Sequence, residues 1–150
     1  MRNHNILENK KTHEGKNQEY YNLGEGMLNS ARINVKLRYS LIKYFHSIFI
    51  QKRGIGAVLQ SLFFLYPSDD RCYIEEVANK QFLWDDALMV VGVFEVGVQH
   101  ISPYFPKDYW YNFHSGTPVH ATNEKGSFHS VYSPVSGLIQ LFIKGGKIIF

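Results

Sequence analysis

The chain has 150 residues, of which 45% are hydrophobic and 15% aromatic, and it carries a formal net charge of +3. This length supports one domain with a core of its own, and the apolar and aromatic content excludes an intrinsically disordered chain. Basic residues alternate with acidic and apolar ones along the chain, which argues against a nucleic-acid partner. Cys72 is the single cysteine, so neither an internal disulfide nor a cysteine-based metal site can form.

The first third of the chain combines a polar segment with one amphipathic helix. Residues 1–28 are polar and contain several glycines, which predicts a loop with at most a short helical turn. From Asn29 or Ser30 to a C-terminal cap at Gly54, apolar residues recur every three or four positions, which predicts one helix of about five to six turns. A membrane-surface or partner helix is the alternative, but packing on a core is the usual role of such a face. The side expected to be buried consists of Ile33, Leu37, Leu41, Tyr44, Phe45 and Ile48.

After Gly56 the sequence changes to short β-branched and aromatic runs separated by turn residues. These runs predict strands within 57–67, 87–94, 100–106, 109–113 and 138–150, arranged as a sandwich or as an antiparallel sheet folded on itself. Gly145-Gly146 between two apolar runs predicts a hairpin. No apolar run is long enough for a membrane span, since "ALMVVGVFEVGV" is short and contains Glu95, and no signal-peptide core precedes the polar N-terminal segment.

Three acidic doublets are candidates for catalytic carboxylates, because glycosidases use a pair of carboxylates as acid and nucleophile. Asp69-Asp70 lies in a turn with Asx-type hydrogen bonding, Asp85-Asp86 links two strands, and Glu75-Glu76 is expected at the surface. The histidines His114, His120 and His129 lack the spacing of a zinc site, and no phosphate-binding loop is present. The residues by themselves show no self-contained catalytic set, and we expect no cofactor and no metal.

Six segments stand out in chain order: "RNHN", "LRYSLIKYFHSIF", "SLFFLYP", "QFLWDDALMVVGVFEVG", "YFPKDYWYNFHSG" and "LFIKGGKIIF". Taken in this order, they resemble the C-terminal stretch of the family-31 glycoside hydrolases, of the acid α-glucosidase and maltase type. The resemblance implies an α+β fragment in two parts. Residues 1–54 would be the last strand tip and final helix of a (β/α)8 catalytic barrel, and residues 55–150 a proximal C-terminal antiparallel β-sandwich.

The same resemblance assigns a site residue. His4 matches the family's histidine that binds the sugar ring next to the cleaved bond, while Arg2 and Asn3 would shape the loop around it. The family's two catalytic aspartates lie upstream of this motif, so the resemblance implies that the chain contains neither of them. It further implies a parent enzyme that hydrolyses terminal α-linked glucose with retention, and an isolated chain that is inactive.

An alternative from another class is a non-catalytic structural or sugar-binding β module, which would use exposed aromatic residues such as Trp84, Tyr109, Trp110 and Tyr111. For partners, we expect the glucoside or oligosaccharide substrate of the parent enzyme, no nucleic acid, and self-association through the apolar helix face if nothing else covers it. The family's relatives are lysosomal, secreted or in the endoplasmic reticulum, and the sequence leaves the compartment open.

Overall fold

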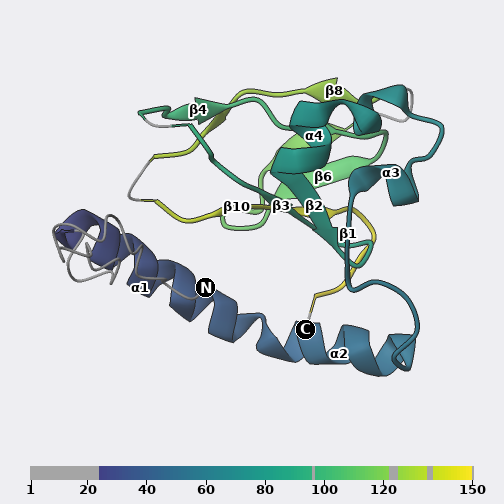
Figure 1. The fold of residues 1–150 in the computed structure, drawn as a ribbon, viewed down its shortest axis with the longest axis horizontal. Coiled ribbons are helices and arrows are strands. Elements are labelled where there is room, and N and C mark those ends of the chain that lie inside the picture. The colour runs from purple at the N-terminus through teal and green to yellow at the C-terminus, as the bar shows by residue number, and fades with distance from the viewer. Residues whose placement is uncertain (1–23, 96, 122–124, 135–136, 150) are drawn as a thin grey trace, which may run out of the picture.

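The structure is a computed structural model that describes residues 24–95, 97–121, 125–134 and 137–149. Two consecutive helices, α1 (Glu25–Ser40) and α2 (Ile42–Lys52), lie along one side of a twisted sheet (Figure 1). Three short helical segments follow: α3 (Leu62–Leu65), the 3-10 helix η2 (Asp70–Tyr73) and α4 (Glu75–Lys80). The strands are β1 (Leu59–Gln60), β2 (Gln81–Trp84), β3 (Leu88–Val91), β4 (His100–Ile101), β5 (Tyr104–Phe105), β6 (Tyr109–Asn112), β7 (Pro118–Ala121), β8 (Ser127–Phe128), β9 (Val131–Tyr132) and β10 (Gln140–Lys144).

The central sheet has six strands in the order β1-β2-β3-β10-β6-β7, and all of its neighbouring strands are antiparallel. Strand β10 lies between β3 and β6, with Leu141 opposite Val90 and Ile143 opposite Tyr111. Two further antiparallel pairs, β4 with β9 and β5 with β8, form a second layer. The predicted antiparallel β half is therefore confirmed.

The predicted single helix is two helices, and it begins earlier than predicted. Gly24, with φ +93°, precedes the first turn of α1, so residues 25–28 belong to the long helix itself and not to the predicted loop with a short helical turn. The break falls at Leu41. There the Ser40 hydroxyl donates to the Leu37 carbonyl at 2.7 Å, an oxygen that the Leu41 main-chain nitrogen also reaches at 3.2 Å. At the other end the left-handed cap is Arg53, one residue before the predicted Gly54.

Helix α2 covers one face of the central sheet. Leu41, Tyr44 and Ile48 are buried as predicted, packed against β3 and β10 in a cluster that includes Leu88, Val90 and Leu141. The prediction was wrong for Ile33, which is 43% exposed. Helix α1 contains no buried residue, and most of it extends past the sheet (Figure 1).

The opposite face of the sheet carries the larger core. Successive side chains of a strand point to opposite faces, so Leu88 and Val90 face α2 while Met89 and Val91 join this second cluster. All four residues of β3 are buried as a result. The remaining members come from α3, η2, α4 and the strands: Leu62, Cys72, Val77, Leu83, Tyr104, Phe105, Trp110 and Phe142.

The side chain of Gln81 connects the two β layers. Its amide nitrogen donates to the Tyr104 carbonyl at 2.9 Å, and its amide oxygen accepts from the Tyr104 main-chain nitrogen at 2.8 Å. Gln81 is buried, and these bonds satisfy the buried amide while fixing β5 over β2.

Two strand predictions were wrong. In the run 57–67 only Leu59–Gln60 pairs with a neighbour, and Leu62–Leu65 forms helix α3 so that Leu62 enters the larger core. Gly145 and Gly146 form a turn, with φ +76° at Gly146, but residues 147–149 are not a strand. Both edges of β10 are already paired, with β3 and β6, so a returning strand has no edge to join. The segment instead places Ile149 against the α2 side of the sheet.

Candidate functional site

The predicted site residues Arg2, Asn3 and His4 lie outside the described residues, so the subsite stays a prediction. Within the described part of the chain, no group of three or more histidine, cysteine, aspartate or glutamate side chains is placed to hold a metal ion. The helices described there include none that is long and apolar enough to cross a membrane.

The first acidic doublet has a structural role. Asp69 accepts a hydrogen bond from the Arg71 main-chain nitrogen at 3.2 Å, which is the predicted Asx-type turn at the start of η2. Its other oxygen accepts from the Tyr104 hydroxyl at 2.6 Å. Burial, followed by the hydrogen bond to Asp69, raises the pKa of Tyr104 above its usual range. Asp69 therefore fixes the segment before η2 to strand β5.

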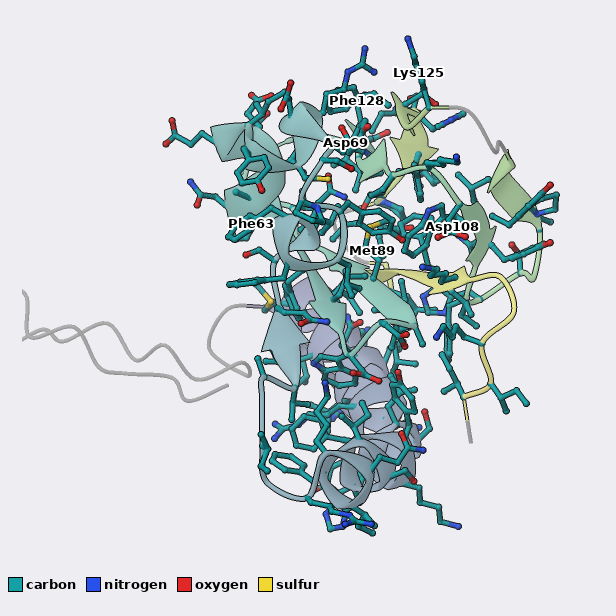
Figure 2. The ribbon with its side chains drawn as sticks, turned by 90° about the vertical axis from the view of Figure 1, so that its right-hand side faces the viewer. Phe63, Asp69, Met89, Asp108, Lys125 and Phe128 are labelled. Carbon is teal, nitrogen blue, oxygen red and sulfur yellow. The ribbon has the colours of Figure 1, made fainter. Side chains whose placement is uncertain are left out.

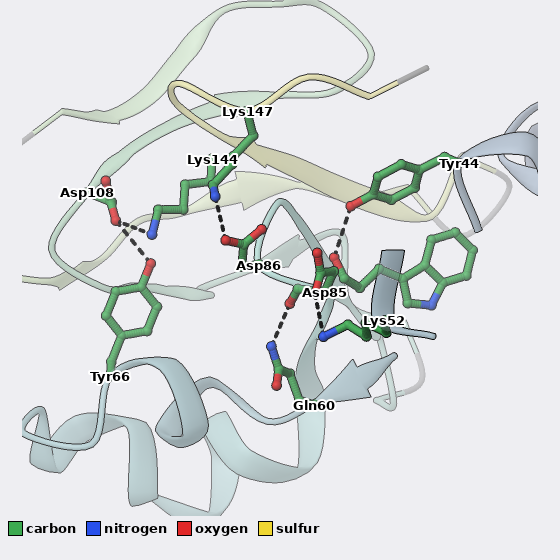
Figure 3. A network of polar contacts seen from close by, with 10 residues as sticks. Tyr44, Lys52, Gln60, Tyr66, Asp85, Asp86, Asp108, Lys144 and Lys147 are labelled. Atoms are coloured by element: carbon green, nitrogen blue, oxygen red, sulfur yellow. Dashed lines mark hydrogen bonds and ion pairs between the residues drawn. The ribbon is translucent and has the colours of Figure 1, made fainter. Parts of the chain in front are cut away.

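The second doublet holds helix α2 to the β2–β3 turn, as predicted for a link between two strands (Figure 3). Lys52 pairs with Asp85 at 2.7 Å, and Lys147 pairs with Asp86. The Tyr44 hydroxyl donates to the Trp84 carbonyl at 3.2 Å, and its pKa is raised by burial and then by the two neighbouring carboxylates. These carboxylates have cationic partners and are structural.

Asp108 anchors the end of α3 to the sheet. It pairs with Lys144 at 2.7 Å and accepts from the Tyr66 hydroxyl at 3.1 Å, and the Lys144 ammonium lies 5.2 Å from the centre of the Tyr66 ring (Figure 3). Burial, reinforced by Asp108, raises the pKa of Tyr66 above its usual range. The remaining doublet, Glu75-Glu76, is exposed in the first turn of α4.

Two of the three candidate histidines also have local partners. His114 contacts the Ile139 carbonyl at 2.9 Å and His129 contacts the Ser127 hydroxyl at 2.8 Å. The side chain of His120 is outside the described residues. His114 and His129 thus take part in hydrogen bonds within the sheet domain.

The aromatic residues proposed for a sugar-binding module divide into two groups. Trp110 is fully buried and donates to the Pro106 carbonyl at 3.0 Å, and Trp84 packs at 5.5 Å between ring centres against Phe45. Tyr109 and Tyr111 are partly exposed on β6. Because Trp110 is a core residue, these rings do not form one binding surface.

The described surface includes a smaller and a larger hollow near the elements described above. The smaller one, of about 170 Å³, lies beside the α2 network and is lined by residues such as Gln51 and Asp86. The larger one, of about 270 Å³, lies between α4, the end of β3 and β4. The sequence reasoning did not identify Phe94, an exposed aromatic residue that lines the larger hollow. The local sequence signal for this contact is a large aromatic residue two positions after Gly92, within the run 87–94 that was predicted to be a strand.

The geometry defines an antiparallel-sheet domain with a helix on one face, in which the carboxylates of Asp69, Asp85, Asp86 and Asp108 hold neighbouring elements together. Residues 56–149 match the family described as the glycosyl hydrolase family 31 C-terminal domain. The chain therefore belongs to glycosyl hydrolase family 31, as the sequence resemblance implied.

Particular relatives extend this match beyond the sheet domain. The chain is 31% identical over 149 residues to a probable alpha/beta-glucosidase of Arthroderma benhamiae, an alignment that covers 99% of this chain and 16% of that protein. It is 34% identical over 113 residues to the lysosomal alpha-glucosidase of Mus musculus, covering 75% of this chain and 11% of that protein. The chain thus spans a small part of the length of the curated relatives it matches.

Solved structures show the same fold. A GH31 dextranase of Flavobacterium johnsoniae, complexed with isomaltotriose, superposes with a TM-score of 0.78 at 26% identity, covering 91% of this chain and 16% of that one. A glucosidase II alpha subunit superposes with a TM-score of 0.72 at 20% identity, which shows the fold alone.

Proposed function

We propose that this chain is the C-terminal part of an α-glucosidase that hydrolyses terminal α-linked glucose from oligo- or polysaccharides. The observation that carries the proposal is the alignment of 99% of the chain, including the segment before the sheet domain, with a probable alpha/beta-glucosidase. In this proposal residues 1–54 complete the catalytic barrel and residues 55–150 form the sheet domain that supports it.

The exposed apolar residues of the two helices support this arrangement. Leu41, Tyr44 and Ile48 face the sheet, whereas other large apolar residues of α1 and α2 are exposed to solvent. A buried side chain of this size stabilises by about 1.5–3 kcal/mol, so a barrel packed here would gain substantially. Without it, the same surface would favour self-association of the isolated chain. The exposed residues are Met27, Ile33, Val35, Tyr39, Ile42, Phe49 and Ile50.

His4 would contribute to substrate binding in this enzyme. A histidine ring can donate to one sugar hydroxyl and accept from another, and such hydrogen bonds can strengthen as the sugar ring approaches an oxocarbenium ion. The nucleophile and the acid/base would be two carboxylates about 5 Å apart in the upstream part of the barrel, giving retention of configuration. The isolated chain would then be inactive, because one histidine replaces neither group.

A segment exchange tests this proposal. The aligned segment of the Arthroderma benhamiae relative is replaced by this chain, and kcat and KM are measured with maltose for the hybrid and for its His4→Ala variant. We expect the hybrid to be active, and His4→Ala to lower kcat and kcat/KM together by about tenfold, which corresponds to a lost buried hydrogen bond.

The control is Lys107→Ala, which removes an exposed side chain just before β6 in the sheet domain and leaves the subsite and the two helices untouched. Circular dichroism of each hybrid separates loss of folding from loss of activity. A folded hybrid whose His4→Ala and Lys107→Ala variants have equal kinetics would refute the role of His4. A folded hybrid without any activity on maltose would refute the proposed function.

A further inference from the structure

The larger hollow lies on the side of the sheet domain that α1 and α2 do not cover. Its walls come from α4, the end of β3 with residues 92–95, and β4, with Phe128 of β8 at one side. In Figure 1, α4, β4 and β8 lie on the far side of the sheet from the two long helices, and in Figure 2 Phe128 lies at the end of the molecule away from them. A barrel docked on the exposed apolar residues of α1 and α2 would leave this hollow open.

Phe94 provides a supported aromatic surface in the hollow. A Cβ added at Gly92 would lie 2.6 Å from Cζ of Phe94, so the ring lies directly against the Gly92 backbone. The φ of Gly92 is not positive, so its backbone does not itself require glycine. The contact requires glycine because a side chain at this position would collide with the Phe94 ring. The phenyl group is nevertheless 68% exposed. One part of the ring is thus held by the main chain while the rest is available to a ligand.

Hydrogen-bond donors and acceptors line the same hollow as this ring. Lys80 and Glu95 form an ion pair at 2.9 Å, and Glu76 and His100 are further exposed residues of the lining. Carboxylates accept hydrogen bonds, the ammonium donates them, and the imidazole can do either. The two carboxylates outnumber the single lysine, which disfavours an anionic ligand. The lining suits a ligand that carries many neutral donors and acceptors.

We propose that this hollow binds a neutral oligosaccharide, with the apolar face of one sugar ring stacked on Phe94 and its hydroxyls bonded to the polar rim. Its volume of about 270 Å³ is close to the smallest ligand pockets of about 300 Å³, which suits the end of a sugar chain. The inference rests on the proposed function for the choice of glucose oligomers. It goes beyond that function by placing a second contact with the sugar outside the catalytic barrel.

Titration of the full chain with maltotriose and isomaltotriose, followed by NMR chemical shifts, tests the proposal without any turnover. We expect saturable binding in the millimolar range, with shifts concentrated at residues 76–81 and 92–103. Phe94→Ala should weaken the binding by about tenfold, as expected for loss of a stacking partner. Gly92→Ala should weaken it as well, because the added methyl group displaces the ring.

The matched control is Phe64→Ala, which removes a ring of similar exposure, 66%, from α3. Its binding should equal that of the unaltered chain. Three results would each overturn the proposal. The first is no saturable binding of either trisaccharide, and the second is an equal loss of affinity in Phe64→Ala and Phe94→Ala. The third is tighter binding of a sulfated disaccharide than of maltotriose. Binding is measured here without catalysis. If the chain binds maltotriose but its hybrid enzyme is inactive, the proposed function is refuted while the proposed binding site is supported.

Discussion

Replacing Ile48 by alanine tests how firmly helix α2 is held by the sheet. Ile48 is 1% exposed and packs in the cluster that includes Leu88, Val90 and Leu141. The substitution removes three carbon atoms, worth about 0.8 kcal/mol each on transfer from water, and leaves a cavity that adds to the loss. We expect the free energy of unfolding to fall by about 3 kcal/mol, within the range of about 2–5 kcal/mol that such core truncations show.

Urea denaturation of the full chain, followed by circular dichroism, measures this change. Ile50→Ala is the matched control, because it makes the same substitution in the same helix at a residue that is 76% exposed. We expect its effect to stay within about 0.5 kcal/mol. Equal effects of the two substitutions would show that α2 does not pack on the sheet as described, and would refute the reasoning.

Three further predictions concern the polar contacts and glycines. Burial raises the pKa of the Cys72 thiol to about 12 and also raises the pKa of the Tyr44 hydroxyl. The folded chain therefore keeps protons that the unfolded chain loses above about pH 8.5 and about pH 10, respectively. The urea midpoint of unfolding should fall as the pH rises from about 8 to about 11. A Cβ at Gly126 would overlap the Tyr104 hydroxyl and lie 2.6 Å from the Phe105 carbonyl oxygen. Gly126→Ala should therefore lower the free energy of unfolding by about 1–3 kcal/mol in the same urea assay. Gly26 lies in open space on α1, so Gly26→Ala should raise the free energy of unfolding slightly. The Asn34 side chain donates to the Gly137 carbonyl at 3.2 Å and accepts from the Ile139 main-chain nitrogen at 2.8 Å. Asn34→Ala should therefore speed amide hydrogen exchange in α1 and leave exchange in α2 unchanged. Exchange rates in α1 equal to those of the unaltered chain would contradict this role of Asn34.

The elements that the sequence predicted well are those whose signal is local. Asp85-Asp86 between two apolar runs indicated the β2–β3 turn, and the period of the helix identified Leu41, Tyr44 and Ile48 as its buried side. The bend at Leu41 escaped prediction because the apolar spacing continues through it.

The errors arose where distant partners decide the structure. Gly145-Gly146 has the sequence of a hairpin, but β10 is already paired on both edges by β3 and β6, which come from earlier in the chain. Residues 62–65 have β-forming side chains, and burial of Leu62 under the sheet favours helix there. The contact of Phe94 with Gly92 depends on a side-chain rotamer that spacing does not specify. The role of His4 came from the family resemblance and stays a prediction.

The central claim is that the catalytic groups belong to a larger enzyme, to which this chain adds the His4 subsite and the sheet domain. The most direct measurement is the release of glucose from maltose by the purified 150-residue chain, compared with a buffer blank and with the His4→Ala chain. We predict no release above the blank for either protein. Glucose release that is abolished by His4→Ala would contradict the claim, because the chain would then contain a complete catalytic site.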